Sequence, residues 1–543
     1  MPAAIASPGN RRADVIRFTR LIAALREPAR YPPGASGPPE RVDLLETHIS
    51  CVLLAGDFAY KVKKPVNLGF LDFSTLAARR FFCEEELRLN RRTAPSLYLD
   101  VMAITGSAAD PVLGGEGAPI EYAVRMRRFP QEALLDSMAR NGTLPPGCMD
   151  TLGLALAQFH RSLPPAGADC PYASSAEVLA AAMQNFDQLR AIGGADEHGE
   201  SLERLRDWAA AEHAKLADVF DARRRDGFVR ECHGDLHLRN IVLLDGVPVP
   251  FDCIEFNAEF RWIDVMNEIA FLVMDLEEHR LPDFAFRFLN RYLEVCGDYA
   301  GLRVLRFYVV YRALVRAKVA WIRARQPGME AAAVARAGAE YAHYLKFAQG
   351  VARPTRSGVI VMHGLSGSGK TTIARQLAES LQAVLLRSDV ERKRLHGLAQ
   401  QARTGSGFGQ GIYSAVVTER TYARLADLAR HAIAAGYPVV LDAAFLTAGQ
   451  RASFRALAHE AGVPFAIVSC EAPLQTLRER VARREAQGGD ASEAGPAVLE
   501  QQILAREPLG QDEQAAVVAI DTCAGEAAVR ASAGVLANRL ADV

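Results

Sequence analysis

The sequence predicts two domains of different fold class, an N-terminal α+β region and a C-terminal α/β region with a parallel sheet. The chain has 543 residues, which is more than a single hydrophobic core usually supports. Long helical patterns end near residue 350, before the Pro-bearing segment ARPTRSG. Beyond residue 358, buried-strand patterns alternate with helical ones, as in βαβ units. We therefore expect domains at 1–350 and 358–543, joined by a linker at 351–357.

The composition is that of an ordinary globular protein. The 63 Lys and Arg against 64 Asp and Glu give a net charge of −1, which disfavours a nucleic-acid scaffold or a polybasic membrane-surface protein. The nine cysteines are odd in number and form no Cys-x-x-Cys pair, which argues against a zinc knuckle and a disulfide framework. The first residues do not resemble an export signal, and no apolar run approaches about 18 residues. These observations predict a cytoplasmic protein without a membrane segment.

The elements before residue 350 follow from hydrophobic spacing. Val15, Phe18, Ile22 and Leu25 are three or four residues apart, which predicts an amphipathic helix at 15–25. Short apolar runs at 41–66, broken by Ala-Gly-Asp, predict a hairpin in a small antiparallel sheet. The remaining expected elements are a helix at 76–92, a strand at 121–129, and helices after about residue 150, interrupted by a polar loop at 233–264.

A phosphate-binding motif opens the second domain. The segment from Gly364 to Thr371 matches G-x-x-x-x-G-K-[ST] and lies between an apolar strand and a helix. Backbone amides at the helix start face anionic oxygens, the lysine neutralises outer phosphates, and the Thr371 hydroxyl is a ligand for Mg²⁺. The alternative, a glycine-rich turn with a solvated lysine, does not explain the strand–helix context. We expect the cradle to comprise Gly364, Ser366, Gly367, Ser368, Gly369, Lys370, Thr371 and Thr372.

A carboxylate suited to the metal ends a later strand. The run Val-Val-Leu-Asp442 places an acid where a Walker-B aspartate holds the water shell of Mg²⁺, although many strands end in an aspartate without such a role. The next residue, Ala443, is not the acid that hydrolytic ATPases use to activate water. No Asn-Lys-x-Asp segment is present for guanine recognition. Transfer of a phosphoryl group to an acceptor is therefore favoured over a motor ATPase or a GTPase.

Further charged residues of the second domain fit transfer chemistry. Asp389 follows the second strand, where an acceptor hydroxyl would meet a carboxylate, with Arg392 and Arg394 nearby for anionic groups. A helix N-cap beside a solvated basic face is the alternative. Arg480 and Arg484 precede the polar loop GGDASEAG, which is typical of a lid that carries arginines over the transferring phosphate. The alternative for that segment is a solvated helix.

The second domain resembles the P-loop small-molecule and nucleotide kinases. The resemblance rests on GLSGSGKTT, RSDVERKR, VVLDA and RERVARREAQGGDASEA. It implies a P-loop NTPase fold, ATP, Mg²⁺ and a small acceptor.

A second phosphotransfer signature lies in the first domain. His233-Gly-Asp235 and Asn240 match H-x-D-x-x-x-x-N, and an apolar run leads to Asp252, which we expect on a strand. In a kinase-like catalytic loop, Asp235 would accept the proton of the acceptor hydroxyl while Asn240 and Asp252 bind metal. The alternative is a polar loop between two strands, with caps and turns.

These residues, HGDLHLRN followed by FDCIEF, resemble the aminoglycoside phosphotransferase family, which implies a two-lobed, protein-kinase-like fold. The resemblance also implies a strand lysine paired with a helix glutamate. Lys61 and Glu86 fit that order, although Lys63, Lys64 and Glu85 are close by. The sequence lacks Asp-Phe-Gly and a kinase-type glycine-rich loop, which disfavours protein substrates. As a pair, the two domains resemble bacterial fusion proteins that join an aminoglycoside phosphotransferase-like domain to an ATP-binding one.

The sequence thus predicts a phosphotransferase that uses ATP and Mg²⁺ at two kinase-type sites, each acting on a small hydroxylated acceptor. An alternative is a regulatory ATP-binding protein, with a ligand-sensing first domain and a nucleotide-switch second domain. A third possibility is a kinase toxin that acts on a sugar nucleotide or on RNA. The sequence leaves the acceptors, the coupling between the sites, the pathway and the oligomeric state open.

Overall fold

The structure is a computed structural model in which two compact units are described separately. It describes residues 8–541 except 36, 70, 194–197, 326–328, 355, 406–408 and 488–491, and only the backbone of residues 8–12, 526, 527 and 541. The first unit comprises the described residues of 1–144, 163–173 and 229–268, and the second those of 145–162, 174–228 and 269–543. The expected linker at 351–357 includes residue 355, which lies outside the described residues, and this boundary stays a prediction.

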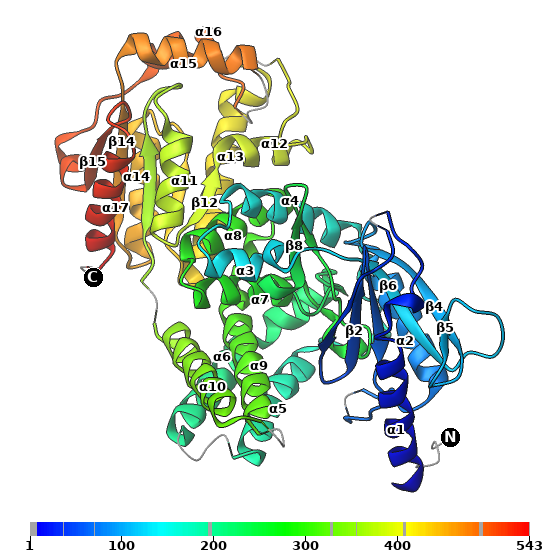
Figure 1. Cartoon of the computed structure of the whole chain (residues 1–543). Coiled ribbons are helices and arrows are strands. Elements are labelled where there is room, and N and C mark those ends of the chain that lie inside the picture. The colour runs from blue at the N-terminus through cyan, green and yellow to red at the C-terminus, as the bar shows by residue number, and fades with distance from the viewer. Residues whose placement is uncertain are drawn as a thin grey trace. The chain divides into compact units, whose positions relative to one another are not determined.

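A six-stranded antiparallel sheet forms the centre of the first unit (Figure 1). Its strand order is β1-β2-β3-β6-β4-β5. Because side chains alternate across a strand, Tyr60 and Val62 of β3 pack in the apolar core on one face while Lys61 and Lys63 point to the other. The strands are β1 (Val42–Glu46), β2 (Ser50–Ala55), β3 (Phe58–Lys63), β4 (Tyr98–Gly106), β5 (Pro111–Leu113) and β6 (Glu121–Arg127).

The predicted hairpin between β2 and β3 and the predicted strand at β6 are confirmed, whereas β4 and β5 were not expected from the sequence. The polar loop expected at 233–264 is also subdivided, because it contains a hairpin of β8 and β9 and the strand β10, which pairs with β7. The other elements of the unit are α1 (Pro8–Ala24), α2 (Leu76–Asn90), α3 (Leu135–Arg140), β7 (Val229–Glu231), β8 (Ile241–Leu244), β9 (Val247–Pro250) and β10 (Trp262–Asp264), with short 3₁₀ turns at Pro28–Arg30, Gln131–Ala133, Leu238–Asn240 and Ala258–Phe260.

The second unit begins with helices. Several of these helices are apolar around much of their circumference, which is typical of helices inside a bundle. In α9, for example, Leu305, Tyr308 and Leu314 are buried. The helices are α4 (Gly147–Ser162), α5 (Ser175–Ala191), α6 (Gly199–Arg225), α7 (Val265–Glu278, which starts in the first unit), α8 (Pro282–Cys296), α9 (Leu302–Ala324) and α10 (Ala331–Ala352), with a 3₁₀ turn at Tyr299–Gly301.

The rest of the second unit is a parallel five-stranded sheet with helices on both faces. Its order is β12-β13-β11-β14-β15, so the expected α/β class is confirmed. The strands are β11 (Val359–His363), β12 (Val384–Arg387), β13 (Val439–Asp442), β14 (Phe465–Glu471) and β15 (Val517–Asp521). The helices are α11 (Lys370–Ser380), α12 (Ser388–Leu395), α13 (Ala415–Ala434), α14 (Ala448–Glu460), α15 (Leu474–Gln487), α16 (Pro496–Ala505) and α17 (Glu526–Ala541), with 3₁₀ turns at Gly411–Tyr413 and Gln511–Ala516.

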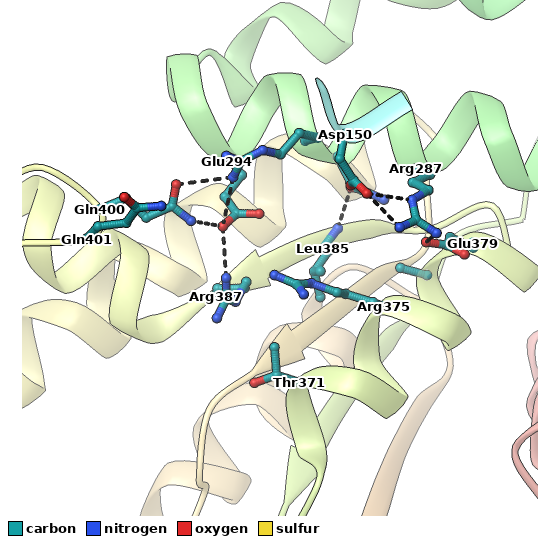
Figure 2. Close-up of a pocket in the computed structure, with 13 residues that line it drawn as sticks. Asp150, Arg287, Glu294, Thr371, Arg375, Glu379, Leu385, Arg387, Gln400 and Gln401 are labelled. Atoms are coloured by element: carbon teal, nitrogen blue, oxygen red, sulfur yellow. Dashed lines mark hydrogen bonds and ion pairs between the residues drawn. The ribbon is translucent and has the colours of Figure 1, made fainter. Parts of the chain in front are cut away.

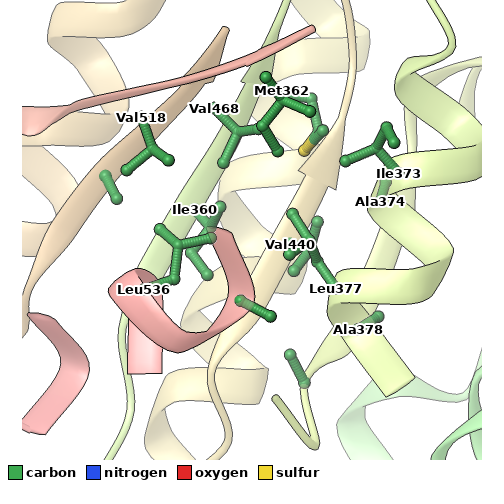
Figure 3. Packing of buried hydrophobic residues seen from close by; sticks show 14 of the residues in the cluster. Ile360, Met362, Ile373, Ala374, Leu377, Ala378, Val440, Val468, Val518 and Leu536 are labelled. Atoms are coloured by element: carbon green, nitrogen blue, oxygen red, sulfur yellow. The ribbon is translucent and has the colours of Figure 1, made fainter. Parts of the chain in front are cut away.

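An apolar core on one face of this sheet holds β11, the strand that leads into the phosphate motif. Ile360 and Met362 of β11 pack against Leu377 of α11, and Leu536 of α17 belongs to the same cluster (Figure 3). All five residues of β11 are buried, because the strand is covered on both faces. Burial of β11 and α11 therefore holds the loop between them in place.

Helix α8 lies along β12, the edge strand of the parallel sheet. Its Asn290 hydrogen-bonds to backbone groups of Ala383 and Leu385. Within the described part of the chain, no helix combines the length and apolar character needed to cross a bilayer. None of the nine cysteines forms a disulfide in the structure.

Candidate functional site

A buried cluster of lysines and carboxylates joins β3 to α2 in the first unit. Lys61 Nζ lies 2.8 Å from Glu86 Oε1 and 2.5 Å from Asp252 Oδ1. Lys63 Nζ donates to the other oxygen of Glu86 at 2.7 Å and also to Glu255. The structure therefore brings the expected Lys61 and Glu86 together, but two lysines share this glutamate. From the sequence, Lys63 was only an alternative to Lys61, and Glu255 was not singled out.

The charges of this cluster stabilise one another. Burial alone would lower the pKa of Lys61, but Asp252 and Glu86 outweigh it and hold that pKa well above its ordinary value. Burial likewise favours the neutral acid at Glu86, yet the two lysines outweigh it and lower the pKa of Glu86. A cationic Lys61 beside the anionic Asp252 is what binding of nucleotide phosphates and a metal requires.

Asp235 and Asn240 lie side by side on the loop before β8. Asn240 Nδ2 donates to Asp235 Oδ2 at 2.8 Å and to the backbone oxygen of Asp235 at 3.0 Å. His237 Nε2 lies 3.3 Å from the same carboxylate oxygen. Among the described residues, none hydrogen-bonds to Asn240 Oδ1, so that oxygen is available as a ligand.

Glu268, at the start of α7, fixes the backbone of this loop. Its carboxylate accepts hydrogen bonds from the backbone N–H of His233 at 3.0 Å and of Gly234 at 2.7 Å. Gly234 has φ +88°, and a Cβ there would lie 2.7 Å from Phe260 O, so only glycine fits. Burial lowers the pKa of His233, which keeps the ring neutral. Sequence reasoning missed Glu268, because it lies more than thirty positions downstream with no motif around it.

Asp252 does not lie on a strand, so that expectation was wrong. Strand β9 ends at Pro250, and Asp252 has φ +63°. This left-handed conformation costs energy in a residue with a Cβ and is typical of functional positions. Hydrogen bonds on both sides hold it: Asp252 N donates to Tyr98 Oη at 3.2 Å, and Cys253 N donates to Asn90 Oδ1 at 2.8 Å. The turn directs the carboxylate to Lys61.

In the second unit, the phosphate motif forms a tight loop between β11 and α11. Gly367 has φ +82°, and a Cβ there would lie 2.7 Å from Leu477 O. Ser366 N donates to Gln502 Oε1 at 2.8 Å, which ties the loop to α16. Ser368 Oγ is buried without a hydrogen-bond partner in the described structure, as expected for an atom whose partner is a ligand. Thr372 is exposed on the first turn of α11.

Lys370 folds back over the loop. Its Nζ donates to Gly364 O at 2.7 Å and to Leu365 O at 2.8 Å. Burial lowers the pKa of Lys370, and the nearby Asp442 and Asp389 only partly oppose this shift. An added anionic phosphate would therefore stabilise the cationic lysine.

Thr371 and Asp442 meet where β11 and β13 run in parallel beside each other. Thr371 Oγ1 donates to Asp442 Oδ2 at 2.8 Å, and Arg387 Nε lies 3.4 Å from the same oxygen. A hydroxyl and a carboxylate are hard oxygen ligands of the kind that Mg²⁺ prefers. The donor set fits a magnesium ion, as do the carboxylates and amide oxygen of the first unit.

Asp389 lies in the first turn of α12, and its N-cap is Arg387. The half-buried Asp389 carboxylate makes no hydrogen bond or ion pair with a described residue and raises the pKa of nearby Lys370. The side chains of Arg392 and Arg394 bind other groups of the protein. Arg392 Nη1 donates to the backbone at Ile412, and Arg394 pairs with Glu391 and the backbone of Glu294.

The two arginines of the expected lid contact the protein itself. Arg480 donates to Thr522 Oγ1 at 2.9 Å and to Gly367 O at 3.4 Å, so it joins the phosphate loop to the end of β15. Arg484 Nη2 donates to Ala494 O at 2.6 Å. Residues 488–491 of the expected lid loop lie outside the described residues. Contact of Arg480 and Arg484 with a transferred phosphate stays a prediction.

Comparison with known proteins finds one family match before residue 350 and another after it. The model of the Phosphotransferase enzyme family matches residues 82–308, and an AAA domain model matches residues 359–509. The uncharacterized protein Rv2004c of Mycobacterium tuberculosis is 32% identical over 454 residues, which cover 83% of this chain and 88% of that protein. The chain belongs to the family of this mycobacterial protein. The present chain thus joins an aminoglycoside phosphotransferase-like kinase domain and a P-loop kinase domain.

Two further likenesses concern single domains of this family member. The adenylyl-sulfate kinase of Myxococcus xanthus is 32% identical over 126 residues, which cover 22% of this chain and 62% of that enzyme. A solved structure of the amicoumacin kinase hAmiN is 13% identical, with a TM-score of 0.39, and the match covers 63% of this chain and 96% of that one.

Proposed function

We propose that the chain is a phosphotransferase with two sites, each of which uses ATP and Mg²⁺ to phosphorylate a small hydroxylated acceptor. The observation that carries the proposal is that each unit brings a lysine close to a set of oxygen ligands: Lys61 with Asp252 in one, and Lys370 with Thr371 and Asp442 in the other. The chain matches the Phosphotransferase enzyme family over residues 82–308 and an AAA domain model over residues 359–509, which supports the proposal. The odd number and wide spacing of the cysteines favour a reducing compartment such as the cytoplasm.

In the first site, Asp235 takes the part of the acceptor-orienting base. Its carboxylate is a third exposed, and the Asn240 amide and His237 ring hold it in one orientation. The acceptor hydroxyl would pass its proton to Asp235 as its oxygen bonds to the γ-phosphorus, and the bond from that phosphorus to the β–γ bridging oxygen breaks to release ADP. Lys61, held by Glu86, would bind the phosphates.

In the second site, the backbone of the loop and Lys370 would bind the phosphates. Asp389 is the free carboxylate nearest this lysine that the sequence singled out, and we assign it to the acceptor hydroxyl. Ala443 follows Asp442 and cannot activate water, which favours transfer to an acceptor over hydrolysis.

Mg²⁺ would be held by Asn240 and Asp252 in the first site and by Thr371 and Asp442 in the second. When bound, the ion neutralises charge on the phosphate oxygens as the phosphoryl group moves. The residues described here orient the acceptor, accept its proton and bind the phosphate tail.

The test uses the full chain with γ-labelled ATP, Mg²⁺ and a panel of hydroxylated metabolites. We expect labelled products of two kinds. Asp235→Asn should reduce one kind by about 10²–10⁴-fold, as loss of a general base does, and Lys370→Ala should remove the other. Asp245→Asn, on the exposed turn of the β8–β9 hairpin, and Lys346→Ala, on the exposed face of α10, are the matched controls.

Three outcomes separate the alternatives. If each variant by itself abolished both kinds of labelled product, the two sites would not be independent. Nucleotide binding without any labelled acceptor would favour the regulatory ATP-binding protein. Growth arrest on expression of the full chain, lost in Lys370→Ala, together with labelled RNA or sugar nucleotide would favour the toxin.

A further inference from the structure

We propose that Glu294 of α8 is a positioning residue for the nucleotide site of the second unit, where it holds Arg387 so that the carboxylate of Asp442 stays available to a divalent cation. This inference rests on the proposed function, in which Asp442 and Thr371 hold Mg²⁺. Helix α8 lies in the region matched by the phosphotransferase family, whereas Asp442 lies in the AAA domain match. One domain of the family would thus complete the metal site of the other.

A chain of short polar contacts connects the helix to the metal site. Glu294 Oε1 lies 2.9 Å from Arg387 Nη1. Arg387 Nε lies 3.4 Å from Asp442 Oδ2, which also accepts the hydrogen bond from Thr371 Oγ1. The side chains of Glu294, Arg387 and Asp442 are each less than a tenth exposed. Figure 2 shows Arg387 below Glu294, to which a dashed line joins it, with Thr371 lower in the view.

The guanidinium therefore lies between two carboxylates, and its shorter contact is with Glu294. A cation beside Asp442 competes with Mg²⁺ for the same oxygen and repels the ion. Glu294 balances that cation, which leaves the charge of Asp442 to the metal. Removal of the Glu294 charge takes away the nearer of these two carboxylates, so that more of the positive charge of the buried Arg387 acts on Asp442.

Several contacts fix Glu294 in this position. Gln400 Nε2 donates to its carboxylate, and Arg291 Nη1 lies 3.7 Å away. One turn earlier on α8, Asn290 binds the backbone of β12, the strand that ends in Arg387. Such redundancy is what a group that must stay at one distance from another charge requires.

A cavity of about 480 Å³ adjoins this chain of contacts. Glu294, Arg387 and Thr371 line it, and so does Asp150, which binds Arg287 at 2.6 Å. In the described part of the chain, Asp150 pairs with Arg287 and makes no hydrogen bond or ion pair with Asp442. It therefore offers a matched control: a carboxylate in the same cavity, paired with a different arginine.

The test measures metal binding in the full chain rather than turnover. Hydrogen exchange of the peptide at 359–373 is followed at fixed ATP with increasing Mg²⁺, which reports the second site alone. In Glu294→Gln we expect the Mg²⁺ concentration for half-maximal protection to rise about tenfold, because the buried cation beside Asp442 loses its nearer carboxylate. Protection of the same peptide by ATP without metal should stay within about twofold of the wild-type value, because the phosphate loop is unchanged. Asp150→Asn should match the wild type.

Two further variants separate this role from a merely structural one. Glu294→Asp keeps the charge and should need less Mg²⁺ than Glu294→Gln. Arg387→Met removes the competing cation, so it should need no more Mg²⁺ than the wild type and should suppress the defect when combined with Glu294→Gln. The inference is overturned if Glu294→Gln behaves like the wild type, or if Arg387→Met raises the Mg²⁺ requirement. If the hydrogen-exchange protection by ATP in the wild-type chain did not depend on the Mg²⁺ concentration, that result would instead contradict the metal site itself.

Discussion

Asn290 of α8 pairs with Leu385 of the edge strand β12 as a neighbouring strand would. Its Oδ1 accepts a hydrogen bond from Leu385 N at 2.8 Å, and its Nδ2 donates to Ala383 O at 2.9 Å. The edge of a sheet presents unpaired backbone groups, which are costly when buried and prone to pair with other chains. One side chain satisfies both groups here, while α8 covers the edge.

We predict that Asn290→Ala destabilises the parallel sheet by about 2–4 kcal/mol, because it leaves one donor and one acceptor buried without partners. Hydrogen exchange of the peptide that contains β12 measures the loss. The control is Gln475→Ala, which removes an exposed amide contact with Glu479 and should cost less than about 0.5 kcal/mol. Equal exchange rates in β12 for both variants would show that the amide is not needed.

Glu86→Gln tests the lysine–carboxylate cluster of the first unit. Glu86 is fully buried and pairs with both Lys61 and Lys63, so its neutralisation leaves buried positive charge unbalanced. We expect a loss of about 3–5 kcal/mol, measured as the free energy of opening of β3 and α2 by hydrogen exchange.

The control for this change lies on the same helix. Glu84 pairs with Arg80 at the surface, where both side chains are more than half exposed. Glu84→Gln should cost no more than about 0.5 kcal/mol. A similar cost for the two substitutions would contradict the electrostatic account of the cluster.

Gly367→Ala should weaken nucleotide binding at the second site. The added Cβ would lie 2.7 Å from Leu477 O, and φ of +82° adds roughly 1–3 kcal/mol of backbone strain. We expect protection of the phosphate loop by Mg·ATP to weaken at least about tenfold, since the loop must shift. Gly462→Ala has a positive φ of +65° but open space around the new Cβ, and should bind nucleotide normally. Unchanged protection in Gly367→Ala would show that the loop tolerates a side chain.

His363 predicts a pH dependence of stability. It ends β11 with no exposed surface, and its Nδ1 lies 3.1 Å from Phe445 O. Burial lowers the pKa of His363 to about 4, against about 6.5 in an unfolded chain. As the pH falls, His363 therefore binds a proton in the unfolded state before it does so in the folded state. The contribution of neutral His363 to folding stability is complete above pH 6.5 and is lost as the pH falls towards 4.

Between pH 7 and pH 5, this group should cost about 2 kcal/mol of unfolding free energy. Urea unfolding of the full chain at both pH values, followed by pulse proteolysis of the region after residue 358, measures the loss. His363→Asn keeps a donor for Phe445 O and should flatten the pH dependence by that amount. His459→Asn, at an exposed position of α14, should leave it unchanged. The same slope in wild type and His363→Asn would contradict the prediction.

Much of the fold and the residue types of both sites follow from local pattern. The strand–loop–helix around Lys370 and the parallel α/β sheet were predictable, because a glycine-rich loop between a buried strand and a helix has few structural solutions. The hairpin of β2 and β3 was predictable from its apolar runs and turn. Strand β4 was missed, since its burial does not alternate cleanly.

Contacts between distant segments were not predictable. Glu268 binds the loop of Asp235 from another element, and Glu255 reaches Lys63 over nearly two hundred residues. Asp252 was expected on a strand, yet its left-handed turn depends on Tyr98 and Asn90, which come from β4 and α2. Each of these contacts depends on packing, which spacing along the chain does not encode.

The order of residues alone predicts two phosphate-binding signatures, their order along the chain, and the glycines that let the loops approach a phosphate. These are local properties, set by backbone geometry and residue type within a few positions. Only the tertiary structure decided that Lys61 and Lys63 share Glu86, and that Glu294 of one family domain faces Arg387 of the other. Charge–charge energies depend on distance and burial, and both are fixed only when the chain has folded.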